Sequence, residues 1–238
     1  MTPDKDSFTV DEVLNAVDSL ETASSFLDRA DTFKWKWITI ALDHALYGFC
    51  VSAVAIGDPF NVLSDTNDDG HMFERPGQGW RRSKRVKIDG GPAYRIEWEL
   101  CDPAPEPTEQ LEPSELRLAR LLKGDLIGFW TALARAQDPA LWMARMSNTR
   151  ALQVSDDQMR GIVRLHNLVR NELVHFVPKT NTFRVKGIQE VSKDVINSIG
   201  FLVFQSFTVH AFKEDIRGRV RSAIVKFGDY YEAQQRRP

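Results

Sequence analysis

Apolar residues recur every three or four positions along most of the chain, which is the period of an amphipathic helix. They predict helices over about residues 9–30, 33–56, 114–136, 139–146, 155–177 and 188–213, and leave open whether the last continues to 232. The stretch 33–56 is apolar on nearly all sides, as in a helix at the centre of a bundle. Thr9 with Glu12, and Ser155 with Gln158, have the spacing of capping boxes that begin two of these helices.

Residues 58–113 lack the helical period. Within them, short alternating runs on either side of a DGG turn predict a β-hairpin that pairs 83–88 with 93–100. PAPEPTEQLEP then forms an acidic, proline-rich connector. We therefore expect a single all-α domain over 1–238. It would be an up-and-down bundle of four to five long helices, with a small β-hairpin insertion between the second and third helices.

The composition is typical of a soluble protein, with 42% hydrophobic and 27% charged residues. Two cysteines are too few for a disulfide framework, which favours a reducing compartment. The N-terminal residues lack the basic and apolar regions of a secretory signal. One apolar stretch is long enough to span a membrane, but Asp43 and His44 lie near its middle, where charge is costly. We expect a cytoplasmic protein without membrane contact.

The net charge of -2 conceals an uneven distribution of basic residues. One run contains Arg81, Arg82, Lys84, Arg85 and Lys87. Such a run can bind the phosphates of RNA. It can also be the solvated face of an edge strand that charge protects from aggregation, which is the interpretation we favour. A second basic cluster near the C-terminus contains Arg217, Arg219, Arg221 and Lys226.

The helix predicted over 155–177 carries the polar residues best suited to chemistry on RNA. Asn171 and His175 are one turn apart and face one target together. An imidazole can move the proton of a ribose 2′-OH near neutral pH, a guanidinium such as that of Arg170 can hold the phosphate oxygens, and an amide can orient them. Neither a metal nor a cofactor is needed. Arg170 and His175 diverge by about 140° around an α-helix, so we expect two helices related by a dimer axis to complete the site.

The segment RNELVH, which begins at Arg170, resembles the signature of the HEPN superfamily (higher eukaryotes and prokaryotes nucleotide-binding). In that signature an arginine, a polar residue, three further residues and a histidine lie near the end of a helix. LHNLVRNELVHFVPK and KWKWITIALDHALYGF also resemble a HEPN-like subgroup found on plasmids and integrons. The resemblance covers the helices and not residues 58–113. It implies a helical bundle, usually dimeric, whose paired motif helices form a metal-independent endoribonuclease site.

Carried over by position, the resemblance makes Arg170, Asn171 and His175 the catalytic residues. Many family members are toxins or antiviral defence effectors, so an antitoxin or other protein partner is an open question. Others have lost activity. The alternative function is therefore a non-catalytic scaffold that dimerises and binds RNA or a protein through the same groove. Members silenced by a partner nucleotidyltransferase usually have a tyrosine two residues after the histidine, and Val177 stands there instead.

Several other polar and aromatic residues have two interpretations. Arg164 and His166 could extend the RNA site, although a surface position is the simpler interpretation for His166. Asp43 and His44 are either a satisfied buried pair, which we favour, or part of the active cleft. Trp35 and Trp37 could stack on bases, but a place in the core or an interface fits better. The histidines, Asp43 and Cys101 show no metal-ligand spacing, so we expect no metal.

Overall fold

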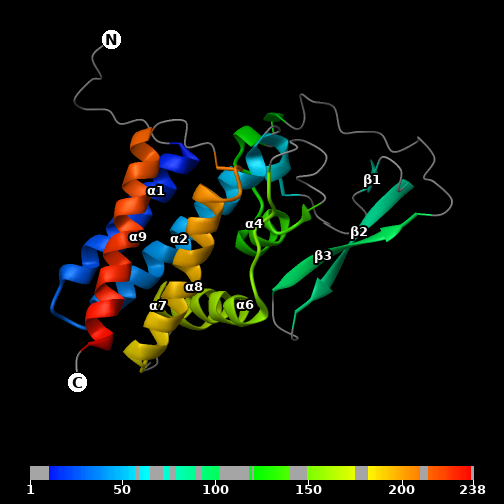
Figure 1. Ribbon diagram of the computed structural model, residues 1–238. Helices are drawn as coiled ribbons and strands as arrows, with labels where there is room; N and C mark the ends of the chain where they lie inside the picture. Colours follow the sequence, from blue (N-terminus) through cyan, green and yellow to red (C-terminus); the bar gives the residue numbers. More distant parts are fainter. Residues whose placement is uncertain are drawn as a thin grey trace, which may run out of the picture.

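The computed structural model describes residues 11–56, 59–64, 72–75, 79–88, 93–101, 118–119, 121–139, 149–174, 182–209 and 214–236. Within these ranges the chain is mostly helical, with one small antiparallel sheet that lies to one side of the helices (Figure 1). The predicted all-α class with a small β insertion is confirmed at this level.

Four long helices pack side by side: α1 (Glu12–Ser25), α2 (Lys34–Ala55), α8 (Val185–Phe204) and α9 (Glu214–Gln235). α2 contacts α1 on one side and α8 on another, and α9 covers α1 (Figure 1). α2 buries most of its side chains between these neighbours, but Trp37 and His44 on one face are exposed, so the helix is central without being covered on all sides. α2 is also long and apolar enough to cross a membrane, a test that the core helix of a soluble protein passes too.

The first helix begins later than its sequence predicts. Asp11 is the N-cap, and its carboxylate accepts a hydrogen bond of 2.7 Å from the backbone N–H of Leu14. The capping box predicted from Thr9 and Glu12 is therefore wrong, because Glu12 is the first residue of the helix. Thr9 itself lies outside the described residues. A short 3₁₀ turn, Phe26–Asp28, follows the end of α1.

The sheet has three antiparallel strands in the order β1 (Met72–Arg75), β2 (Gly79–Lys87) and β3 (Tyr94–Leu100). The predicted hairpin is confirmed as β2 and β3, while its DGG turn and the acidic connector lie outside the described residues. β1 was not predicted, and it makes β2 the central strand. The interpretation of the basic run as an edge strand is therefore wrong for Arg81 and Arg82, which β1 covers, whereas Ser83–Lys87 pairs with β3 alone among the described residues.

The basic run of β2 faces acidic residues of β3. Arg82 lies opposite Glu99, and Lys84 lies opposite Glu97. Directly opposite side chains of unlike charge stabilise an antiparallel pair. The register places two of the five basic residues opposite carboxylates, whereas Arg81, Arg85 and Lys87 lie opposite Leu100, Ile96 and Tyr94.

Two long helices of the sequence analysis are broken in the structure. The helix predicted over 114–136 is interrupted at Gly124, whose φ of 74° favours glycine, and at Leu126, which forms an isolated bridge with Leu63. Among the described residues of this range, α4 (Phe129–Ala136) and short helical turns at 118–119 and 121–122 remain. The last helix is likewise two, since α8 ends at Phe204 and α9 begins at Glu214. The helix predicted over 139–146 falls almost wholly outside the described residues.

Candidate active site

The predicted motif helix is present, but its middle is not an α-helix. Ser155 is the N-cap of α6 (Asp156–Val163), and its capping box with Gln158 is confirmed. A π-helical segment, Arg164–Arg170, follows, and then a short α7 (Asn171–Val174). The apolar spacing also predicts a buried stripe through Ile162, Leu165, Val169, Leu173 and Phe176: the first three are buried, Leu173 is half-buried, and Phe176 lies outside the described residues.

The π-helical segment changes how the polar residues are arranged. The backbone N–H of Asn171 donates to the carbonyl oxygen of His166, five residues earlier rather than four. One widened turn of this kind inside an α-helix is uncommon, and such turns occur frequently at functional sites. Because this segment ends at Arg170 and Asn171–Val174 is again α-helical, it changes the angle between His166 and Arg170 and does not test the projection from Arg170 to His175. His175 and Val177 lie outside the described residues.

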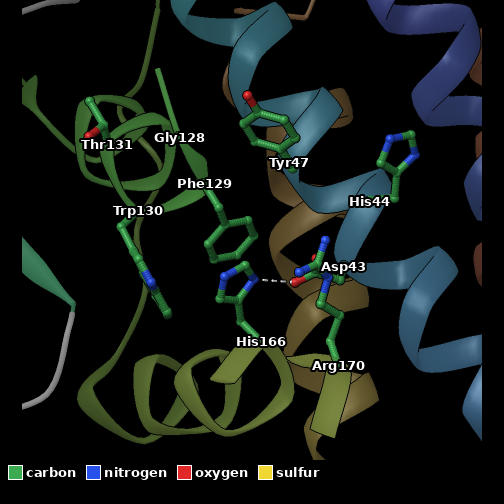
Figure 2. Close-up of a pocket in the computed structure, with 9 residues that line it drawn as sticks. All are labelled: Asp43, His44, Tyr47, Gly128, Phe129, Trp130, Thr131, His166 and Arg170. Carbon is green, nitrogen blue, oxygen red and sulfur yellow. Dashed lines mark hydrogen bonds and ion pairs between the residues drawn. The ribbon is translucent and has the colours of Figure 1, made fainter. Parts of the chain in front are cut away.

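A cavity of about 520 Å³ lies between the π-helical segment, α2 and the start of α4. Nine residues line it: Asp43, His44, Tyr47, Gly128, Phe129, Trp130, Thr131, His166 and Arg170. Figure 2 shows His166 and Arg170 rising from the π-helical segment toward Asp43 on α2, with the aromatic side chains of α4 on the opposite wall. The cavity is therefore built from three parts of the chain that are far apart in sequence.

Asp43 is the polar centre of this wall. One carboxylate oxygen lies 2.7 Å from Nδ1 of His166, and the other lies 3.4 Å from Nε of Arg170. The Asp43 side chain is only 7% exposed. A buried carboxylate is costly unless it is paired and hydrogen-bonded, and here two basic side chains supply the pairing. The interpretation of Asp43 and His44 as a buried pair is therefore wrong, because the partners of Asp43 are His166 and Arg170 and His44 is exposed; both residues line the cavity.

The ring of His166 is held on several sides. It stacks on Phe129 with 4.1 Å between ring centroids and 11° between planes, and Trp130 stands nearly perpendicular to it at 4.9 Å. The His166 side chain is 14% exposed, so the interpretation of His166 as a surface histidine is wrong. Stacking and the bond to Asp43 together fix the orientation of the imidazole.

Arg170 also contacts its neighbour in the predicted motif. Its Nη1 donates a hydrogen bond of 2.9 Å to the side-chain carbonyl oxygen of Asn171. A third of the Arg170 side chain is exposed, unlike that of Asp43. Arg170 thus reaches from a buried anchor to the solvent side of the cavity.

His44 and Tyr47 contribute little polar chemistry to the cavity. Nδ1 of His44 lies 2.9 Å from the hydroxyl of Ser19 on α1, and Figure 2 shows its ring turned away from Asp43 and His166. The Tyr47 hydroxyl donates to the carbonyl oxygen of Ile127 at 2.6 Å. Burial raises the pKa of Tyr47, so this phenol stays protonated and acts as a donor.

The other predicted RNA-binding residues do not line this cavity. Arg164 lines a second hollow of about 310 Å³ near the start of α8, together with Arg184. Four residues lie on β2, outside the nine that line the larger cavity: Arg81, Arg82, Lys84 and Arg85. Trp35 is buried in the core, and the half-exposed Trp37 stacks on Phe26 at 6.2 Å.

The C-terminal basic cluster holds α9 in place. Arg219 makes two hydrogen bonds to Glu21 of α1, at 2.9 and 2.6 Å, and Lys226 pairs with Asp28 at 2.6 Å. Arg217 and Arg221 both lie over the ring of Phe204. In the part of the chain that the structure describes, no group of three or more histidine, cysteine or acidic residues is placed to hold a metal ion.

The contact between Asp43 and His166 joins residues 123 positions apart, and sequence periodicity cannot predict it. One signal was available, however: Asp43 is an acidic residue in the middle of an apolar central helix, so it needed a basic partner from another element. No protein-family model, no curated protein and no solved structure matches this chain.

Proposed function

We propose that the protein is a metal-independent endoribonuclease of the HEPN type. In this proposal Arg170 binds the scissile phosphate, Asn171 positions it, and His175 transfers a proton. The four helices α1, α2, α8 and α9 would be the bundle of that family. By the same resemblance, the protein would act in the cytoplasm as a homodimer, as a toxin or defence effector with an antitoxin or other protein partner.

The observation that carries the proposal is the placement of Arg170 and Asn171. They lie side by side where the π-helical segment ends, and Arg170 lines a cavity of about 520 Å³. A guanidinium can donate five N–H bonds in a rigid plane. Nε and one Nη1 hydrogen of Arg170 face Asp43 and Asn171, while Nη2 makes no hydrogen bond to the described residues. Nη2 is therefore available for a phosphate oxygen.

Cleavage by such a site needs no divalent cation. The ribose 2′-oxygen attacks phosphorus, the bond to the 5′-oxygen breaks, and the products are a 2′,3′-cyclic phosphate and a 5′-hydroxyl. Positive charge on the equatorial oxygens stabilises the transition state, which is the role given to Arg170. DNA, which lacks the 2′-hydroxyl, is not a substrate.

The test is cleavage of single-stranded RNA by the purified full-length protein in the presence of EDTA. We expect cyclic phosphate ends, and losses of about 100-fold or more in rate for Arg170→Ala and for His175→Ala. Arg160→Ala is the matched control, since Arg160 is an exposed arginine of the neighbouring α6 that pairs with Asp157. Cleavage that survives in both Arg170→Ala and His175→Ala would refute the site.

A specific observation also supports the non-catalytic alternative. Arg170 already binds Asp43 and Asn171, so it could serve only to neutralise a buried carboxylate. A scaffold of this kind would dimerise and bind RNA or a protein partner without turnover. Salt-dependent RNA binding with no product under any condition would favour the scaffold over the nuclease.

A further inference from the structure

The Asp43–His166 pair has a geometry that a purely structural role does not require. We propose that His166 is a catalytic residue of the same site, a general base that Asp43 orients. Each protomer would then hold the phosphate-binding arginine and a proton-transfer histidine together. This inference rests on the proposed function, because it takes an RNA phosphodiester as the substrate.

The bond to Asp43 fixes which nitrogen of His166 carries the proton. A carboxylate oxygen accepts, so Nδ1, at 2.7 Å from it, is the donor. The lone pair of the neutral ring is then on Nε2, at the opposite edge. This is how a carboxylate orients the imidazole of a general base in catalytic triads.

Nε2 makes no hydrogen bond to any residue that the structure describes, although the ring lines the cavity. Figure 2 shows the ring between Asp43 on one side and Trp130 on the other. Phe129 covers one face of the ring and prevents it from rotating out of the plane set by Asp43. A free basic nitrogen on a fixed ring at a cavity wall is what abstraction of a hydroxyl proton requires.

Arg170 lies beside His166 on the same wall of the cavity. His166 and Arg170 lie four residues apart on the π-helical segment and bind the two oxygens of one carboxylate. Asp43 therefore brings the two basic side chains to the same point of the wall. A single arginine would suffice to neutralise a buried aspartate, so the presence of an oriented histidine as well is better explained by proton transfer.

The reaction balances with these groups. Nε2 of His166 takes the proton of the ribose 2′-hydroxyl as the bond between that oxygen and phosphorus forms. Arg170 neutralises charge on the phosphate oxygens. The bond from phosphorus to the 5′-oxygen breaks, and this oxygen takes a proton from water. Solvent then removes the proton from His166 and restores the starting state.

The experiment measures single-turnover RNA cleavage as a function of pH, together with binding to an uncleavable 2′-deoxy analogue of the same RNA. We expect His166→Gln to lower the rate constant by about 100-fold or more and to flatten the acidic limb of the pH profile, with little change in binding. The Gln amide can still donate to Asp43, which preserves the fold. His166→Asn, whose amide reaches the position of Nδ1, is a second variant of the same kind.

Arg160→Ala is again the control, because its exposed side chain pairs with Asp157 on α6 and does not line the cavity. Asp43→Asn tests the positioning role. It should lower the rate constant for cleavage with little change in binding, because the amide no longer fixes which nitrogen of His166 carries the proton. Circular dichroism establishes that each variant is folded. A wild-type rate and profile in folded His166→Gln would overturn the role of His166 while leaving the nuclease proposal in place.

A mixture of Arg170→Ala and His166→Gln protomers tests whether the two groups act within one chain. If both belong to one protomer, no mixed dimer contains an intact site and the mixture stays inactive. Activity restored by mixing would overturn the arrangement, since the groups would then act across the dimer. Wild-type protein that cleaves no RNA would refute the nuclease and the general base together, an outcome distinct from both of the others.

Discussion

Gly48 of α2 packs tightly against Ala16 of α1, and this contact predicts that alanine in place of Gly48 destabilises the protein. A Cβ atom added at Gly48 would lie 2.8 Å from Cβ of Ala16 and 3.4 Å from its Cα. Carbon atoms pack best at about 3.5–4.0 Å, so the two helices would have to move apart. Neither methyl group can rotate away, because each is fixed to its backbone.

The magnitude is set by two opposing effects. Alanine in place of glycine in a helix interior stabilises by roughly 1 kcal/mol. Overpacking of a buried contact costs about 1–3 kcal/mol. The approach here is between two rigid backbones, which favours the upper part of that range. We expect Gly48→Ala to lower the free energy of unfolding by about 1–2 kcal/mol.

Urea unfolding followed by far-ultraviolet circular dichroism measures this effect. Gly218→Ala is the matched control, since nothing lies within 4 Å of a Cβ at that position of α9, and it should stabilise the protein. The double variant Ala16→Gly/Gly48→Ala should recover part of the loss, because the clash is removed. A Gly48→Ala protein as stable as Gly218→Ala would refute the packing argument.

Three further predictions concern stability and thiol reactivity. Arg219→Ala should destabilise the protein by about 1 kcal/mol, less in high salt, because its two hydrogen bonds to Glu21 hold α9 on α1; thermal melting at two salt concentrations measures this. Burial raises the pKa of Asp194, so its ionised form destabilises the folded protein above that pKa, and Asp194→Asn should stabilise the protein at pH 7. Urea unfolding at several pH values should show that this gain in stability disappears as the pH falls below 3.8, the pKa of the carboxyl in the unfolded chain. Burial also raises the pKa of the Cys50 thiol, so at pH 8 a thiol reagent should label the partly exposed Cys101 and reach Cys50 only in urea; rapid labelling of two thiols in the native protein would contradict this.

The sequence predicts the elements whose signals are local. α2 follows from its continuous apolar run, the β2–β3 hairpin from its alternation, and the start of α6 from the capping box at Ser155. The apolar pattern does not predict the break in the helix expected over 114–136, and the reason is physical. The segment from Lys123 to Gly128 keeps a helical pattern of apolar residues, but the bridge from Leu126 to Leu63 competes with the helix. That competitor lies far away in the sequence.

The candidate site could be predicted only in part. The pattern at Arg170 and Asn171 marked the right helix, and Arg170 does line a cavity. The partner of His166 could not be predicted, because Asp43 lies on another helix and packing decides which residues meet. A π-helical turn also has no clear sequence pattern, so the sequence could not predict how His166 is placed relative to Arg170.

The cavity has two walls that depend on different parts of the molecule. One wall consists of α2, which carries Asp43, and the π-helical segment, which carries His166 and Arg170. The other wall consists of α4, which carries Phe129 and Thr131. α4 in turn is tied to the sheet, since the hydroxyl of Tyr94 lies 2.6 Å from that of Thr131 and Trp98 donates to Asp138 at 2.7 Å. Substitutions in the sheet can therefore reshape the opening of the cavity without disturbing the charged residues opposite. Because the two walls are supported separately, substitutions in the sheet could change which molecules enter the cavity while the groups proposed to act on the RNA keep their positions.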